Sequence, residues 1–145
     1  MNHLKILKNH LLEEIEKINK SLSSARIERD NAPTAMESKS DTSRSRLESE
    51  VTMYEHKLID LKETIGLIPN EKSSNNIIEL WSFVCVKFPS GKLQLIVVTE
   101  GLGGSKIGEI QCISDRTPMC SALIGKKRGE KFTFKGISGK VLSVK

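Results

Sequence analysis

Apolar residues in the first half of the chain recur in alternating steps of four and three. This spacing keeps them on one stripe of a helix, so it predicts one helix from about Asn2 to Arg29 and a second one further along. Leu4 and Leu7 extend the first stripe toward the N-terminus with a slightly different step. The first stripe consists of Leu11, Ile15, Ile18, Leu22 and Ala25, and the second of Leu47, Val51, Tyr54, Leu58, Leu61 and Ile65.

The segment between the two stripes, residues 30–34, favours a chain reversal. It reads Asp-Asn-Ala-Pro-Thr, in which Asn tolerates a left-handed backbone and Pro cannot continue a helix already begun. Two helices joined by a short connection become antiparallel neighbours and bury their stripes against each other. We therefore predict a coiled-coil hairpin over residues 1–68 with its tip near 30–41, and arms of about 42 Å at 1.5 Å per residue.

The pattern changes after Gly66 and Pro69, which are typical of a helix end. Residues 69–76 read as a polar linker, and residues 77–145 as a second domain. Strands are predicted at 77–88 and 93–98 around a turn at 89–92, and later at 108–113, 131–135 and 140–144. Glycines 101, 103 and 104 indicate a flexible loop, and residues 118–124 a helical turn. The predicted fold class is α+β: a long antiparallel helical hairpin, then a small antiparallel β domain with a short helix.

The two predicted parts of the chain differ in net charge. Residues 1–66 hold 11 Lys and Arg against 12 Asp and Glu, a net charge of −1, whereas residues 67–145 hold 12 against 6, a net charge of +6. A basic domain can meet nucleic acid, DNA included, or an acidic protein. The only basic run, residues 126–128, has no aromatic residues interleaved with it for base stacking. With 4% aromatic and 28% charged residues, the core is expected to be thin.

The cysteines and histidines do not indicate a metal site. Cys85, Cys112 and Cys120 form no C-x-x-C pair, so we expect buried free thiols in a reducing cytosol. The three histidines, His3, His10 and His56, are expected on helix surfaces, and Trp81 either in the core or as an exposed partner contact. Since no apolar run is long enough to span a bilayer, we expect a soluble, cytoplasmic protein that contacts no membrane. Because the two helices bury their stripes against each other, we also expect a monomer.

The most informative segment runs from Ile113 to Glu130. Thr117 is suited to cap a helix that has Pro118 at its first position, and Gly125 is suited to end it. Ala122, Leu123 and Ile124 are expected to face inward. No pair of a nucleophile and a base is evident in this segment, so it does not indicate catalysis.

This segment matches the pattern I-S-x-x-[ST]-P-x-x-x-A-L-[IL]-G-K-x-x-G-[DE], and it resembles the C-terminal domain of the bacterial GreA/GreB-type transcription elongation factors. The resemblance covers nearly the whole chain, because in that family an FKBP-like domain without prolyl isomerase activity follows a helical hairpin. It implies an accessory factor, not itself an enzyme, which binds RNA polymerase at the secondary channel. The residues it implies for polymerase binding are Thr117, Pro118, Leu123, Gly125 and Lys126.

The resemblance also implies a role for acidic residues at the hairpin tip. In the family they help hold a catalytic Mg²⁺ in the polymerase active site, so that the polymerase cleaves its own backtracked RNA. Of Glu28, Asp30, Glu37 and Asp41, the last two lie nearest the family's acidic pair and are the expected catalytic and Mg²⁺-binding residues, with nascent RNA nearby. The free protein is not expected to bind Mg²⁺ stably.

Structural explanations for both tip carboxylates remain open. Thr34 and Glu37 fit a capping box, and Asp41 can be a solvated charge favoured by the helix dipole. Residues 36–43 also depart from the usual acidic tip of the family. One alternative is therefore a secondary-channel regulator that does not stimulate cleavage. A prolyl isomerase and a homotypic coiled-coil scaffold are two further alternatives.

Overall fold

The structure is a computed structural model that describes residues 2–31, 42–72 and 76–145. The chain divides into two compact units. Residues 8–67 form the first, called here the hairpin unit, while residues 1–7 and 68–145 form the second, called here the β unit. The first residues of the chain, which the sequence pattern assigned to the hairpin, thus cluster with the β unit.

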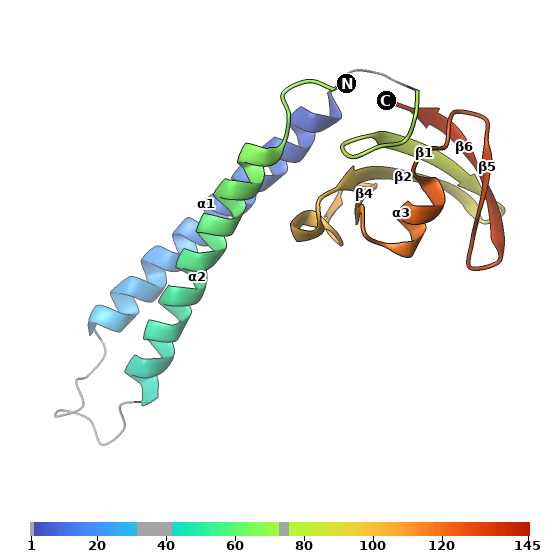
Figure 1. Ribbon diagram of the computed structural model, residues 1–145. Helices are drawn as coiled ribbons and strands as arrows, with labels where there is room; N and C mark the ends of the chain where they lie inside the picture. The colour runs from blue at the N-terminus through green and yellow to red at the C-terminus, as the bar shows by residue number, and fades with distance from the viewer. Residues whose placement is uncertain (1, 32–41, 73–75) are drawn as a thin grey trace. The chain divides into compact units, whose positions relative to one another are not determined.

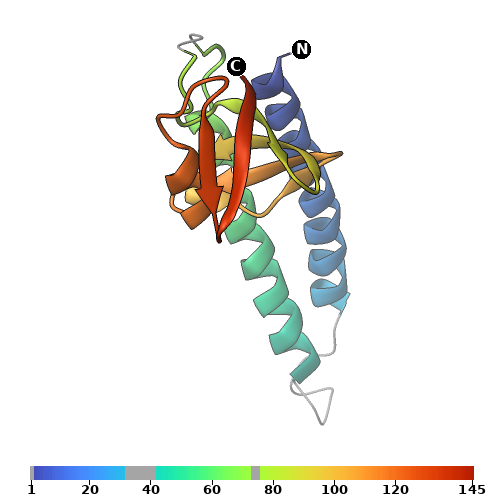
Figure 2. The ribbon, with the colours of Figure 1, turned by 90° about the vertical axis from the view of Figure 1, so that its right-hand side faces the viewer.

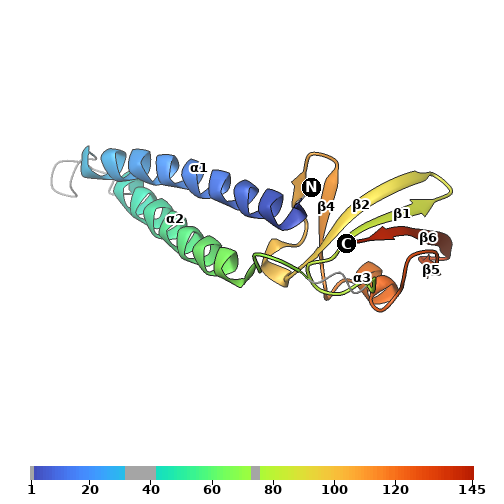
Figure 3. The same cartoon turned by 90° about the horizontal axis from the view of Figure 1, so that it is seen from above.

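The hairpin unit consists of two long helices that lie side by side (Figures 1 and 3). They are α1 (His3–Asn31), whose first residues belong to the β unit, and α2 (Thr42–Leu67). The predicted stripes form their contact: Leu22, Ala25, Val51 and Leu58 are buried together, with Ile15, Ile18 and Tyr54 partly buried against them. This confirms the heptad prediction. Arg26 of α1 also pairs with Glu55 of α2 at 3.2 Å.

The start of α1 differs from the expectation in one residue, His3. The Asn2 side chain caps the helix, since its Oδ1 accepts the backbone N–H groups of Leu4 and Lys5 at 3.1 and 3.3 Å. The prediction that His3 lies on a helix surface is wrong, because this residue is only 7% exposed. Its Nε2 donates to the carbonyl oxygen of Trp81 at 2.8 Å, and its ring lies 5.7 Å from that of Phe83.

Burial changes the protonation of His3. Desolvation lowers the pKa of its imidazole below the usual 6.5, and the positive charges of Lys72 and Lys145 act in the same direction. The hydrogen bond to the Trp81 carbonyl opposes this shift without cancelling it. His3 is therefore held mainly as the neutral imidazole at neutral pH.

One six-stranded sheet forms the centre of the β unit, in the order β3-β4-β2-β1-β6-β5 (Figures 1 and 2). The α+β class is confirmed. One pairing departs from the expected antiparallel domain, because β2 and β4 run parallel and the chain between them carries the short helix η1 and strand β3. The elements are β1 (Phe83–Phe88), β2 (Gly91–Val98), η1 (Glu100–Leu102), β3 (Lys106–Ile107), β4 (Ile110–Ser114), α3 (Pro118–Leu123), β5 (Lys131–Phe134) and β6 (Ile137–Val144).

The first strand begins later than the sequence predicts. Residues 77–82 contribute only an isolated bridge from Ile77 to Lys127, and β1 starts at Phe83. The backbone of Trp81 is left-handed, with φ of 72°, and its N–H donates to Val97 at 2.8 Å. A strand cannot pass through such a residue. The β-branched Ile78 of this segment is fully buried although it lies outside the strand.

The core of the β unit lies between one face of the sheet and α3. Strands β1, β2 and β6 direct Val84, Val86, Leu95, Val97 and Val141 to this face, and α3 adds Cys120 and Leu123. All three cysteines are free thiols. Cys112 and Cys120 are buried as expected, and this burial raises the pKa of both to about 11. Cys85 is half-buried.

Trp81 is 8% exposed, which favours the predicted core position over a partner contact.

Neither α1 nor α2, over the residues that the structure describes, contains a stretch apolar enough to cross a bilayer.

Candidate partner-binding surface on the β unit

A tight turn joins β4 to α3 and forms the centre of the candidate site. The carbonyl oxygen of Ser114 accepts the Thr117 hydroxyl at 2.8 Å and its N–H at 3.1 Å. The Ser114 hydroxyl oxygen accepts the N–H of Arg116 at 3.2 Å, and the Thr117 hydroxyl oxygen accepts that of Cys120 at 3.2 Å. Thr117 is thus the predicted helix cap, with Pro118 in the first turn. Two short side chains hold the turn, and their neighbours are left at the surface.

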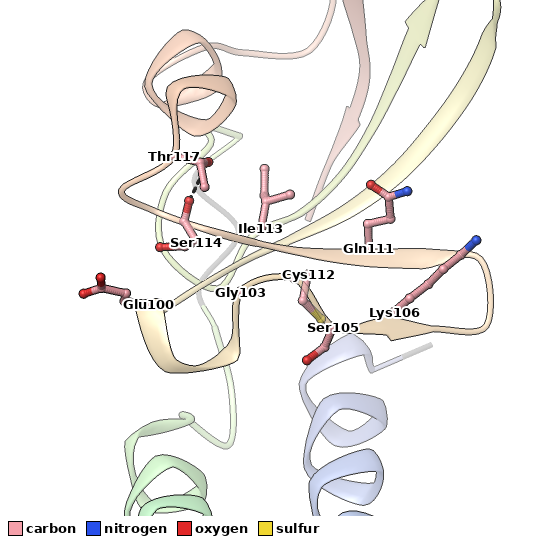
Figure 4. Close-up of a pocket in the computed structure, with 10 residues that line it drawn as sticks. Glu100, Gly103, Ser105, Lys106, Gln111, Cys112, Ile113, Ser114 and Thr117 are labelled. Carbon is pink, nitrogen blue, oxygen red and sulfur yellow. Dashed lines mark hydrogen bonds between the residues drawn. The ribbon is translucent and has the colours of Figure 1, made fainter.

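A hollow of about 520 Å³ lies beside this turn (Figure 4). The loop that precedes β3 closes one side of it, and β4 the other. Gly103 is required there because a Cβ atom on it would lie 2.9 Å from that of Ser114. The predicted glycine loop contains the short helix η1, and its Leu102 is buried to 3% exposure. The lining comprises Glu100, Gly103, Gly104, Ser105, Lys106, Gln111, Cys112, Ile113, Ser114 and Thr117.

An ion pair lies at the rim of the hollow. Arg116 Nη1 lies 3.3 Å from Glu100 Oε2, and the two side chains are 77% and 72% exposed. A pair as exposed as this one contributes little to stability and is easily exchanged for contacts to a partner. Asp115 is also exposed. The sequence pattern did not indicate Glu100, because it lies 16 residues before Arg116 and no local signal links them.

The structure separates the predicted polymerase-binding residues. Pro118 and Gly125 are exposed, while Thr117 and Lys126 are half-buried. Leu123 is fully buried in the core, so it supports α3 from below and has no surface to offer a partner. Six residues of α3 separate Thr117 from the segment after the helix, and of the five predicted residues only Thr117 lines the hollow.

The end of α3 follows the prediction at Gly125 and departs from it at the preceding residue. Gly125 takes φ of 83° just after the helix, and its N–H donates to Ile78 at 2.9 Å. Ile124 was expected to face inward, which is wrong, because it is 44% exposed. The helix is only six residues long, so its last inward position is Leu123.

The predicted tip residues Glu37 and Asp41 lie outside the described residues. The other two tip candidates, Glu28 and Asp30, are exposed near the end of α1, where Asp30 pairs with Arg29 at 3.2 Å. Over residues 2–31, 42–72 and 76–145, no three side chains of His, Cys, Asp or Glu gather closely enough to hold a metal ion.

A scan against models of protein families finds no match, and a search of curated proteins finds none. Solved structures to which the chain is similar include three of Gfh1. The crystal structure of GreA factor homolog 1 (Gfh1) of Thermus thermophilus is 23% identical with a TM-score of 0.43, and the match covers 95% of this chain and 94% of that chain. The crystal structure of Thermus aquaticus Gfh1 is 21% identical with a TM-score of 0.42, and the match covers 97% of this chain and 94% of that chain. A further structure of the transcription factor Gfh1 is 25% identical with a TM-score of 0.42, and the match covers 94% of this chain and 92% of that chain.

Proposed function

We propose that this protein is a transcription factor that binds bacterial RNA polymerase at its secondary channel. The observation that carries the proposal is the Gre-type pattern of residues 113–130, which folds here into a surface turn next to a hollow. A hairpin of two helices, whose apolar stripes are buried against each other, precedes the strands of the β unit, in the order that the resemblance implies. The protein would act as a monomeric accessory factor in the cytoplasm, not as an enzyme by itself.

The turn suits partner binding because its exposed side chains are not the ones that hold it together. The Ser114 and Thr117 side chains make hydrogen bonds of the turn. Asp115 and Pro118 are exposed, and the Arg116 side chain lies at the surface, where it pairs with Glu100. A rigid turn loses little conformational freedom when a partner covers it. Polymerase is expected to contact this rim, and Gly125 and Lys126 would extend the contact past α3.

Binding is tested by measuring the affinity of the full-length protein for bacterial core polymerase. Asp115→Ala combined with Pro118→Ala is expected to weaken binding at least about tenfold, a typical cost for losing interface anchors. Ser121→Ala, an exposed position on α3, is the matched control and is expected to bind as the parent does. Equal affinity of the double variant and the control would contradict the assignment of this surface.

The finer proposal is that Glu37 and Asp41 stimulate cleavage of backtracked RNA by the polymerase. Their carboxylate oxygens are the hard ligands that Mg²⁺ prefers, and two carboxylates supply only part of its coordination shell. The polymerase and water would supply the other ligands, and bound Mg²⁺ would provide the charge that activates a water for phosphodiester hydrolysis. The protein's own contribution would be to position two carboxylates at the hairpin tip, near the nascent RNA.

A stalled, backtracked elongation complex tests this finer proposal. Addition of the protein with Mg²⁺ is expected to shorten the RNA, and Glu37→Ala and Asp41→Ala are expected to reduce shortening while polymerase binding persists. Glu63→Ala, an exposed carboxylate of α2 far along the chain from the tip, is the matched control. If the parent protein binds polymerase but never shortens the RNA, the alternative holds.

That alternative is a secondary-channel regulator without cleavage activity. The composition of residues 36–43, which mixes Lys39 and several hydroxyl residues with the two acids, favours it. Such a regulator is expected to compete with a cleavage-stimulating Gre factor for polymerase and to block its effect on RNA. Cleavage assays with both proteins present distinguish the two functions.

A further inference from the structure

Four lysines form a row across the sheet of the β unit. Lys92 of β2 pairs with Lys87 of β1, Lys87 pairs with Lys140 of β6, and Lys140 pairs with Lys131 of β5. All four are exposed. Neighbouring strands lie about 4.8 Å apart, so the row extends over about 14 Å. Figure 2 shows two of these strands, β5 and β6, side by side in red.

The four lysines share the face of the sheet that is turned away from the core. Residues directly opposite one another in paired strands point to the same side. The neighbours of the row along each strand point the other way: Val86, Val141 and Phe132 belong to the core. The row therefore lies on the outer face, and α3 covers the inner one.

No acidic residue lies within the strands that carry this row. Strands β1, β2, β5 and β6 contain no Asp or Glu. None of the four lysines forms an ion pair with another described residue. Like charges directly opposite each other destabilise a sheet. The row of four lysines therefore lowers the stability of the sheet, and a contribution to folding does not explain why these lysines stand opposite one another.

The surface beside the row is hollowed. A depression of about 310 Å³ has three of the four lysines in its lining, Lys87, Lys131 and Lys140. Ser138, Gly139, Phe88 and Pro89 complete the lining. A depression bordered by cations suits a ridge of negative charge better than a flat anionic surface such as a membrane.

From the row and its depression we propose that this face of the β unit binds the phosphate backbone of a nucleic acid duplex. Each of the four lysines can contact one phosphate, so the row offers up to four phosphate contacts. Binding a single strand would require exposed aromatic side chains for base stacking. The aromatic residues of these strands do not provide them, because Phe88, Phe132 and Phe134 pack against the core and Phe83 is buried. Because contacts to phosphates do not read the bases, we expect binding to be independent of base sequence.

This inference does not rest on polymerase binding, and the free full-length protein tests it. The measurement is fluorescence anisotropy of a labelled 20-base-pair DNA duplex of mixed sequence, titrated with protein at several salt concentrations, beside the same strand unpaired and beside polyglutamate. Four phosphate contacts predict a slope of about −3.6 for the logarithm of affinity against the logarithm of salt concentration. The duplex is expected to bind more tightly than either the single strand or polyglutamate.

Lys87→Gln combined with Lys140→Gln removes the central pair of the row. This variant is expected to bind the duplex about tenfold more weakly and to make the slope less steep by about 2. The matched control is Lys127→Gln combined with Arg128→Gln, which removes the same charge from exposed positions of the same unit. Its affinity is expected to stay within about twofold of the parent, since it leaves the row's phosphate contacts intact.

Three outcomes would overturn the proposal. Equal losses in the two double variants would show that only net charge matters. Tighter binding of the single strand would exclude a duplex backbone as the preferred ligand, and tighter binding of polyglutamate would identify an acidic protein segment instead. Folding of the variants is checked by circular dichroism, and the row variant is expected to melt no earlier than the parent because it removes like-charge repulsion.

Discussion

Gly139 on β6 lies directly opposite Phe132 on β5, and the aromatic ring occupies the space where a side chain would be. A Cβ atom on Gly139 would lie 2.5 Å from Cζ and 2.8 Å from Cε1 of Phe132. The ring cannot simply move outward, because it is only 4% exposed and packs edge-on against Phe88, with the ring centres 5.4 Å apart. Gly139→Ala therefore forces the core of the β unit to rearrange.

Two opposing effects decide the sign of this change. Replacing a strand glycine with alanine normally stabilises by about 0.5 to 1 kcal/mol, because the unfolded chain loses freedom. Overpacking a closed core costs about 1 to 3 kcal/mol, and losing the contact between the Phe132 and Phe88 rings adds about 0.5 to 1.5 kcal/mol. We expect the overpacking to dominate, so that Gly139→Ala lowers the free energy of unfolding of the β unit by about 1 to 3 kcal/mol.

Urea unfolding followed by tryptophan fluorescence measures this effect, because Trp81 is the only tryptophan and belongs to the β unit. Gly101→Ala is the matched control in the same unit, since a Cβ atom there meets nothing within 4 Å, and it is expected to change stability by less than about 0.5 kcal/mol. Phe132→Leu removes the ring, so adding Gly139→Ala to that variant is expected to be neutral or stabilising. A single Gly139→Ala variant as stable as the parent would refute the reasoning.

Three other changes test the same unit. Leu123→Ala is expected to cost about 2 to 5 kcal/mol, because it leaves a cavity in the core, and a loss below about 1 kcal/mol in urea unfolding would show that the site is not closely packed. Thr117→Ala removes the cap of α3 and is expected to cost about 0.5 to 2 kcal/mol, whereas Thr117→Ser should keep most of it. Because the folded state lowers the pKa of His3, the unfolded chain takes up a proton near pH 6.5 before the folded one does, so stability should fall as the pH drops below 6.5. His3→Gln should weaken this dependence in urea unfolding measured from pH 8 to pH 5, and an unchanged pH dependence would exclude His3 as its source.

The features that could be predicted from the sequence depend on neighbours along the chain. The heptad stripes indicate which helix faces are buried, because side chains three and four residues apart share a face, and Leu22, Ala25, Val51 and Leu58 are buried accordingly. The cap at Thr117 and the helix end at Gly125 depend on backbone geometry within a few residues, so they could also be predicted. The same holds for most of the strands after residue 83.

The features that could not be predicted depend on pairs of residues far apart in the chain. The burial of His3 requires Trp81 and Phe83, and the hollow requires Glu100 and Gly103 beside Ser114. The two-part architecture, the helix stripes and the cap of α3 at Thr117 follow from local sequence patterns. The lysines of β1, β2, β5 and β6 come to stand in one row only in the folded sheet, because strand order and register follow from packing across the whole sheet and leave no local signal.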